Sequence, residues 1–141
     1  MINIRNATIN DREQLLSLAK KLATSFEVEE SGFQSVFTEM LELNHVAVAV
    51  AEEDNQLIGY VLGGYRPCFY ASGNVAFVEE ILVHEDFRTQ SIGRRLMAHV
   101  EDWAQTKGCR LVSLATRRAA PFYLAIGYKD SATYFKKDLN P

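Results

Sequence analysis

The chain has 141 residues, 48% hydrophobic and 23% charged, a balance that predicts one soluble globular domain over residues 1–141. Its formal net charge of -3 argues against a nucleic-acid partner, because nucleic-acid-binding surfaces usually carry an excess of basic residues. No apolar run approaches the roughly 20 residues of a membrane-spanning helix, so neither a membrane partner nor a signal peptide is expected. The two cysteines lie far apart and have no Cys-x-x-Cys spacing, which favours a reducing, cytoplasmic location. The three histidines are scattered along the chain and form no metal-ligand cluster.

Hydrophobic periodicity predicts a mixture of strands and helices along the chain. Alternation on either side of a polar turn predicts an antiparallel hairpin, and Gly63 to Pro67 either end its second strand or introduce a bulge. The expected elements, in chain order, are a strand near 2–7, helices near 10–26 and 31–41, strands at 46–51, 57–62 and 74–84, a helix at 92–107, a strand at 111–114, a helix at 119–127 and one or two strands within 128–139.

The most informative stretch joins the strand that ends near residue 84 to the helix that begins near residue 92. Arg88, Gly93, Arg94 and Arg95 lie around the first turn of that helix. Such a junction presents unpaired backbone N–H groups and the positive end of the helix dipole, which together favour an anion, usually phosphate. The stretch contains neither the P-loop motif nor the Gly-x-Gly-x-x-Gly dinucleotide fingerprint.

Two motifs and the order of elements resemble one enzyme superfamily. The loop Arg88-Thr89-Gln90-Ser91-Ile92-Gly93 resembles the pyrophosphate loop, Arg/Gln-x-x-Gly-x-Gly/Ala, of the GNAT superfamily of acetyl-CoA-dependent N-acetyltransferases. The segment Phe122-Tyr123-x-x-x-Gly127-Tyr128 is similar to the aromatic segment that follows the fifth strand in that superfamily. The order β-α-α-β-β-β-α-β-α-β(β) is also that of the GNAT fold. The resemblance implies an α/β (α+β) fold with a mostly antiparallel central sheet of six to seven strands and about four flanking helices.

The resemblance implies acetyl-CoA as cosubstrate, without a metal. In relatives, backbone groups of the fourth strand pair with the pantetheine arm, and loop amides bind the pyrophosphate. Guanidinium groups complement phosphate, which adds arginines of the loop as candidates. The residues expected to bind the cofactor are Ile81, Leu82, Val83, Arg88, Thr89, Gln90, Ser91, Ile92, Gly93 and Arg94.

This sequence departs from the family pattern at two places. Ser91 stands where relatives usually have glycine; a positive φ there costs serine roughly 1 kcal/mol of strain, whereas a helical φ is tolerated. The loop before the last helix lacks the asparagine that contacts the cofactor in many relatives, and carries Arg117 and Arg118 instead. These arginines either replace that contact or are solvated loop charges.

Three residues are candidates for the chemistry. The resemblance implies that Tyr123 protonates the departing thiolate, and a phenol with a pKa near 10 remains a donor at neutral pH. Its structural alternative is a core aromatic with a backbone partner. Glu79 and Glu80 lie where relatives often carry the residue that deprotonates the amine, or are surface charges. Adjacent strand residues point to opposite faces, so only one is expected to reach the acceptor unless a bulge intervenes, and the choice stays open.

The expected function is therefore acetyl transfer from acetyl-CoA to a primary amine by direct attack in a ternary complex. A protein of the same fold that binds acyl-CoA as a sensor or regulator is the alternative, and an unrelated nucleotide-binding domain is a third. The acceptor is expected to be a small-molecule or peptide amine, with the acidic residues favouring a cationic one. Exposed aromatics at Tyr134 and Phe135 are compatible with a homodimer.

Overall fold

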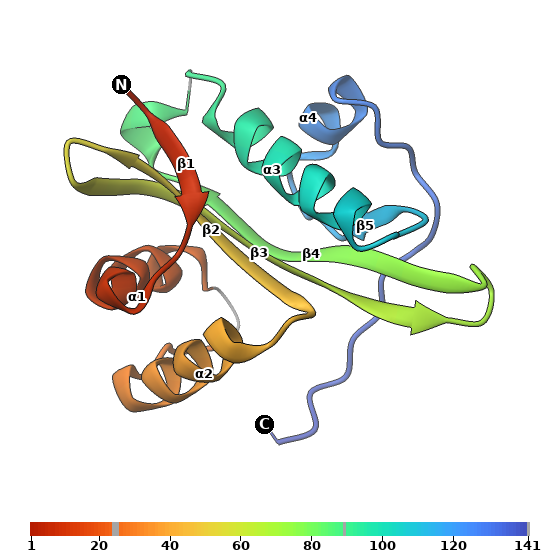
Figure 1. Ribbon diagram of the computed structural model, residues 1–141, viewed down its shortest axis with the longest axis horizontal. Coiled ribbons are helices and arrows are strands. Elements are labelled where there is room, and N and C mark those ends of the chain that lie inside the picture. Colours follow the sequence, from red (N-terminus) through yellow and green to blue (C-terminus); the bar gives the residue numbers. More distant parts are fainter. Residues whose placement is uncertain (24–25, 89, 141) are drawn as a thin grey trace.

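The computed structural model describes residues 1–23, 26–88 and 90–140, and a five-stranded sheet with the strand order β1-β2-β3-β4-β5 lies at its centre (Figure 1). The first four strands pair antiparallel, and β5 pairs parallel to β4. The elements are β1 (Asn3–Asn6), the 3-10 turn η1 (Ile9–Asp11), α1 (Arg12–Leu22), α2 (Glu30–Glu42), β2 (Val46–Glu53), β3 (Gln56–Cys68), β4 (Gly73–Val83), the 3-10 turn η2 (Glu85–Phe87), α3 (Ile92–Thr106), β5 (Val112–Leu114) and α4 (Ala120–Ala125).

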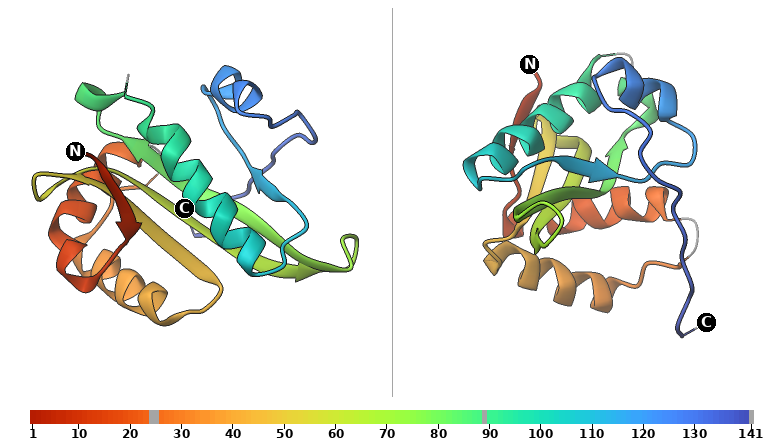
Figure 2. Two further views of the ribbon diagram at one scale, coloured as in Figure 1. Left: turned by 45° about the horizontal axis from the view of Figure 1, so that its top comes forward. Right: turned by 90° about the vertical axis from the view of Figure 1, so that its right-hand side faces the viewer.

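Helices cover both faces of the sheet, with α1 and α2 on one face and α3 and α4 on the other (Figure 2). The α3 face holds the larger buried core, because Ile92, Leu96 and Val100 recur at helical spacing and lie against the strands. On the opposite face, Leu15 and Leu18 of α1 and Phe37 of α2 form a second buried cluster with the sheet. No helix within the described ranges is both long and apolar enough to cross a bilayer.

The mixed fold is confirmed, but the expected count of six to seven strands is wrong, because the segment after α4 forms no strand within residues 128–140. A strand needs one face packed on a core, and here the consecutive Tyr134 and Phe135 are 68% and 86% exposed. Charged residues at 136–138 follow directly, so no one-sided apolar face develops. The tail instead runs past the sheet to the side of α1 and α2 (Figure 2). The expected homodimer stays a prediction.

A bulge interrupts the pairing of β3 with β4. Leu62 lies opposite Glu80, whereas the next residue, Gly63, lies opposite Val78, so Glu79 is one extra residue on β4. Of the two possibilities that the glycines of β3 left open, the bulge is the correct one, since β3 continues to Cys68. The bulge matters for the site because it disturbs side-chain alternation at the two candidate carboxylates.

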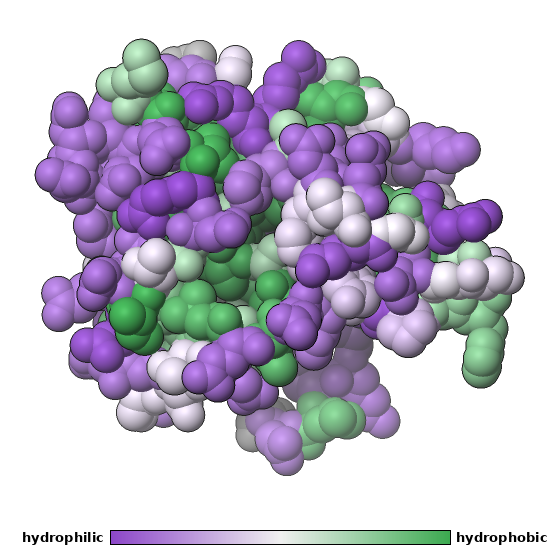
Figure 3. Space-filling model, viewed as in Figure 1, coloured by the Kyte–Doolittle hydropathy of each residue, from purple (hydrophilic) through white to green (hydrophobic). Residues whose placement is uncertain are grey.

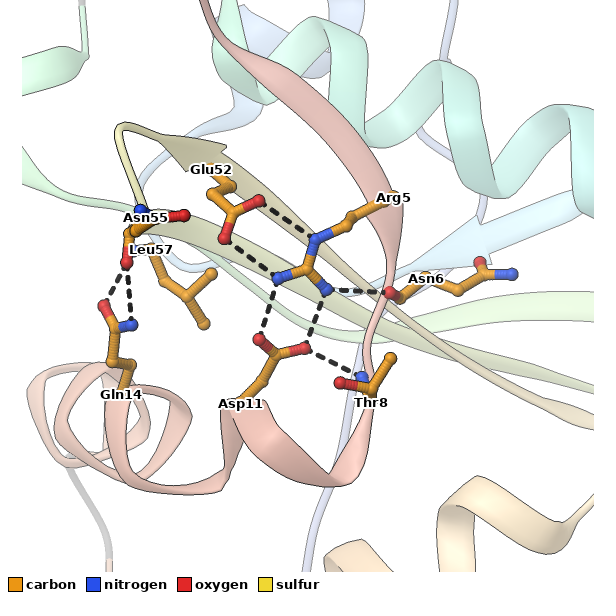
Figure 4. A network of polar contacts seen from close by, with 8 residues as sticks. All are labelled: Arg5, Asn6, Thr8, Asp11, Gln14, Glu52, Asn55 and Leu57. Atoms are coloured by element: carbon orange, nitrogen blue, oxygen red, sulfur yellow. Dashed lines mark hydrogen bonds and ion pairs between the residues drawn. The ribbon is translucent and has the colours of Figure 1, made fainter.

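A polar network ties the first strand to the first helix (Figure 4). The guanidinium of Arg5 donates to both oxygens of Asp11 at 2.9 Å and to both oxygens of Glu52 at 3.1 Å. Asp11 is only 5% exposed, and its Oδ2 also accepts the backbone N–H of Thr8 at 2.8 Å. The hydrogen bonds from Arg5 hold the pKa of the Asp11 carboxyl below its usual value.

Asp11→Ala is expected to lower the free energy of unfolding by about 2 kcal/mol at pH 7, because it leaves Arg5 with Glu52 as its one carboxylate partner among the described residues and removes the acceptor of the Thr8 amide. A lowered folded-state pKa stabilises the protein above the unfolded value, which is 3.8 for Asp11, and this contribution is lost as pH falls below it. Urea unfolding of both proteins between pH 7 and pH 3 checks this. The difference between them should shrink on acidification, and a constant difference would contradict the assignment. Asp138→Ala, in an exposed pair 3.9 Å from Lys136, is the control with little expected effect.

Candidate active site

The N-terminus of α3 has the geometry of an anion site. Strand β4 ends at Val83, η2 turns the chain, and Ser91 directly precedes the helix. The backbone N–H groups of Gly93 and Arg94 have no acceptor among the described residues, as expected for a first helical turn. The amide of Gln90 donates to the carbonyl of Phe87 at 3.3 Å, so it is already used within the turn. Among the described residues, the amides without an acceptor therefore include those at the beginning of α3, while the amide of Gln90 is not one of them.

Ser91 adopts a left-handed conformation, with φ 60° and ψ 22°. This is the case in which serine carries strain at the position where relatives have glycine, since its Cβ approaches the backbone in this region. Thr89, which the sequence also placed in the cofactor loop, lies outside the described residues.

Ser91→Gly is expected to raise the free energy of unfolding by about 1 kcal/mol, because glycine adopts a positive φ without the Cβ penalty. Ser91→Ala is the matched control: it keeps the Cβ, so its unfolding energy should stay near that of the wild type. Urea denaturation of the three proteins gives the comparison. Identical midpoints for the glycine and alanine variants would show that the backbone at this position is not strained.

The three arginines near the loop have different roles. Arg88 Nε donates to the carbonyl of Val83 at 3.1 Å, which fixes the turn after β4 while leaving the terminal nitrogens of the guanidinium available. Arg95 donates to the carbonyl of Ile2 at 3.1 Å and so joins α3 to the start of the chain. Arg94 is exposed and lies at the rim of a cavity of about 430 Å³ between α3 and the end of α4. Arg88 and Arg94 remain candidates for phosphate contact.

Beyond Val78, the edge of β4 that faces β5 has no strand partner among the described residues. The parallel pairing covers only Ala76 to Val78 against Val112 to Leu114, while β4 continues to Val83. This edge, which lacks a strand partner, contains Ile81, Leu82 and Val83, the residues expected to pair with an extended ligand, and the carbonyl of Val83 accepts the Arg88 side chain at 3.1 Å. A free strand edge can add a ligand whose amides mimic another strand, so the expected interaction is geometrically open.

Tyr123 lies on α4, on the same side of the sheet as α3. Its side chain is 7% exposed and packs with Phe122 and Tyr128, at ring-centroid distances of 4.9 and 5.9 Å. The side chain belongs to the buried core on the α3 face, as in the alternative of a core aromatic, and its hydroxyl makes no hydrogen bond with any described residue. Burial raises the pKa of Tyr123 above 10.0, which keeps the phenol protonated at neutral pH. Phe122 in turn contacts the first turn of α3: a Cβ at Gly93 would lie 3.3 Å from the Cζ of Phe122.

Glu79 and Glu80 both line a cavity of about 700 Å³ on the opposite face, between the sheet and the helices α1 and α2. The bulge explains how two consecutive residues reach one cavity. Glu80 is half-buried, and its Oε1 accepts the hydroxyl of Tyr60 at 2.7 Å, whereas Glu79 is exposed. Burial and the Glu80 carboxylate raise the pKa of Tyr60 well above 10.0, so Tyr60 acts as a fixed donor. Tyr123 is not among the residues that line this cavity.

Two residues at the cavity were not identified as site residues from the sequence. Tyr60 sits in an apolar strand, where it reads as an ordinary core aromatic, and only the pairing of β3 with β4 brings it to Glu80. For Arg117 the sequence allows either a cofactor contact or a solvated loop charge, and in the structure this residue lines the cavity. Apolar side chains gather around α1 and α2 on this side of the molecule (Figure 3).

Known proteins match this chain along most of its length. The sequence model of the acetyltransferase (GNAT) family matches residues 13–128. An aminoalkylphosphonate N-acetyltransferase of Salmonella typhimurium is 28% identical over 140 residues, which cover 96% of this chain and 90% of that protein. The solved structure of the aminoglycoside N-acetyltransferase AAC(6')-Iy in complex with CoA has a TM-score of 0.88 at 24% identity, covering 99% of this chain and 96% of that one. A transcriptional regulator from Bacillus halodurans C-125 has a TM-score of 0.89 at 24% identity, covering 99% and 100%. The chain therefore belongs to the acetyltransferase (GNAT) family.

Proposed function

We propose that this protein transfers an acetyl group from acetyl-CoA to a primary amine by direct attack in a ternary complex. One observation carries the proposal: on β4, a bulge that directs two carboxylates towards a large cavity is followed directly by the edge that lacks a strand partner. At its far end this edge leads to the free amides of α3. The acetyl donor and the amine would thus meet from opposite faces of the sheet.

The residues on the α3 face fit the parts of coenzyme A. The amides of Gly93 and Arg94, at the positive end of a 15-residue helix, suit the pyrophosphate. The backbone of Ile81 to Val83 suits the two amides of the pantetheine arm. Acetyl-CoA would supply the acetyl group as a thioester, which is activated towards attack by an amine.

The chain's own residues would move two protons. Glu79 or Glu80 accepts a proton from the arriving ammonium group, directly or through water, so that the nitrogen lone pair is free to attack the acetyl carbon. A carbon–nitrogen bond forms, the carbon–sulfur bond breaks, and the positively charged nitrogen of the new bond gives up its remaining extra proton to solvent water. Tyr123 donates its proton to the departing thiolate and is later reprotonated from solvent. The products are an N-acetylated amine and the free thiol.

Release of free thiol from acetyl-CoA in the presence of amines tests the proposal. A panel of primary amines should give amine-dependent thiol release, with the acetylated product detected by mass spectrometry. Thermal shifts with CoA provide the accompanying binding measurement, because a ligand that binds only the native state raises the melting temperature. Stabilisation by ATP or a dinucleotide, but not by CoA, would indicate an unrelated nucleotide-binding protein and would contradict the proposal.

A second candidate function is an acyl-CoA sensor without turnover. The left-handed Ser91 in the phosphate loop favours it, since the family pattern has glycine there. Thermal stabilisation by CoA without thiol release across the whole amine panel would support this second function.

A further inference from the structure

The cavity on the α1 and α2 face has a mostly hydrocarbon surface. Its apolar lining comes from both helices and the sheet: Leu22 of α1, Phe33, Val36 and Met40 of α2, and Val48 and Leu62 of the strands. Phe33 stacks on the buried Phe37 with a ring-centroid distance of 5.7 Å, so α2 presents an aromatic wall. The volume of about 700 Å³ lies in the range that encloses a small organic molecule.

Two further aromatic side chains at this cavity are largely in water. Phe26, before α2, is 71% exposed, and Tyr134 of the tail is 68% exposed, although both line the cavity. A ligand with an apolar ring would remove part of this aromatic surface from water. A hydrophilic ligand would gain little from covering it.

The charges around the cavity favour a cation. Among its lining residues, the carboxylates Glu27, Glu29, Glu79 and Glu80 outnumber the cations Arg117 and Lys136. The Tyr60 hydroxyl holds Glu80 at the sheet, beside the bulge and the start of the unpaired edge of β4. An ammonium group drawn to this end of the cavity would therefore lie beside the edge expected to hold the thioester.

We propose that the acceptor is an arylalkylamine, a primary amine on a short alkyl arm with an aromatic ring that packs against α2. This inference rests on the proposed function and specifies its substrate class. An aminoglycoside would place many hydroxyls against hydrocarbon, where unpaired polar groups are destabilising. An aminoalkylphosphonate would bring a negatively charged phosphonate close to a mainly acidic cavity and would leave its aromatic wall uncovered.

Steady-state thiol release with a defined amine panel tests the substrate class. The panel contains 2-phenylethylamine, tryptamine, ethylamine, kanamycin and 2-aminoethylphosphonate, each with saturating acetyl-CoA. We expect kcat/KM for the two aromatic amines to exceed that for the other three by about tenfold or more, as burial of a ring predicts. Equal or faster turnover of kanamycin or 2-aminoethylphosphonate would overturn the inference.

A matched pair of variants on α2 locates the ring. Val36 is half-exposed and lines the cavity, whereas the neighbouring Ser35 is exposed and does not. Val36→Asn should raise the KM for tryptamine about fivefold, with the KM for acetyl-CoA and for ethylamine unchanged. Ser35→Asn should change none of them. A wild-type KM for tryptamine in V36N would also overturn the inference.

Two outcomes separate this inference from the proposed function. Thiol release with hydrophilic amines alone would refute the arylalkylamine assignment and leave the acetyltransferase activity standing. Binding of tryptamine without thiol release, measured by calorimetry on the intact protein and weakened in V36N, would refute the activity and support the assigned chemistry of the cavity. Absence of both binding and release would refute both proposals.

Discussion

Replacing Tyr123 by phenylalanine is expected to lower kcat by about 10²- to 10⁴-fold, the usual contribution of a positioned general acid, while the affinity for acetyl-CoA stays nearly unchanged. The variant keeps the ring and its packing with Phe122 and Tyr128, so the fold should be preserved. Only the hydroxyl is lost, and it makes no hydrogen bond with any described residue. Steady-state kinetics, with CoA binding measured separately by calorimetry, distinguishes the two effects.

The pH dependence gives a second measure of the same role. Burial raises the pKa of Tyr123 above 10.0, so the phenol remains protonated, and kcat should not fall on its account until the pH exceeds 10. Tyr128→Phe is the matched control: its hydroxyl donates to Glu101 at 2.7 Å, and its removal should affect stability more than turnover. A Tyr123→Phe enzyme with a wild-type kcat across the pH range would remove this tyrosine from the mechanism.

Glu80→Gln is expected to lower kcat by about 10²-fold or more, and Glu79→Gln by considerably less. Glu80 is half-buried and held by the hydroxyl of Tyr60 at 2.7 Å, whereas the exposed Glu79 is the extra residue of the bulge. A fixed carboxylate is better placed to accept the proton of the amine than a solvated one. The same kinetic assay compares the two isosteric variants.

Tyr60 offers an independent check on this assignment. Tyr60→Phe removes the hydrogen bond that holds Glu80 in place, so kcat should fall in this variant as well, although the carboxylate itself is kept. A larger loss of kcat in Glu79→Gln than in Glu80→Gln would reverse the assignment. Equal wild-type rates in both variants would exclude a carboxylate base from this strand.

The sequence predicted correctly those helices and strands whose apolar residues recur with a clear helical or strand period. The hairpin of β2 and β3 follows from alternation, and α3 from its apolar spacing up to Gly108, whose φ of +72° matches a C-cap glycine. The strand predicted in the tail was wrong, because an aromatic-rich segment forms a strand only where it can pair with another strand and pack against a core. That information lies in the tertiary arrangement, outside residues 128–139.

In the candidate site, too, features set by local sequence could be predicted and features set by tertiary structure could not. The loop motif located the N-terminus of α3 and identified Ser91 as the position whose φ would decide the strain. The glycines of β3 indicated an irregularity, yet the extra residue proved to be Glu79 on the partner strand. The cavity itself could not be predicted, because its volume depends on how far apart α1 and α2 lie over the sheet.

The bulge at Glu79 also bears on how the protein would tolerate a shorter chain. Deleting this one residue would place Val78 and Glu80 in unbroken register with Gly63 and Leu62, so the ladder would become regular. Bulged strands bend and twist more strongly than regular ones, and a straightened β4 would lie flatter beside β5. Such a protein, 140 residues long, should fold, but the β4 backbone proposed to bind the cofactor would be reoriented. An irregularity that adds little to stability would thus set the orientation of the proposed cofactor site.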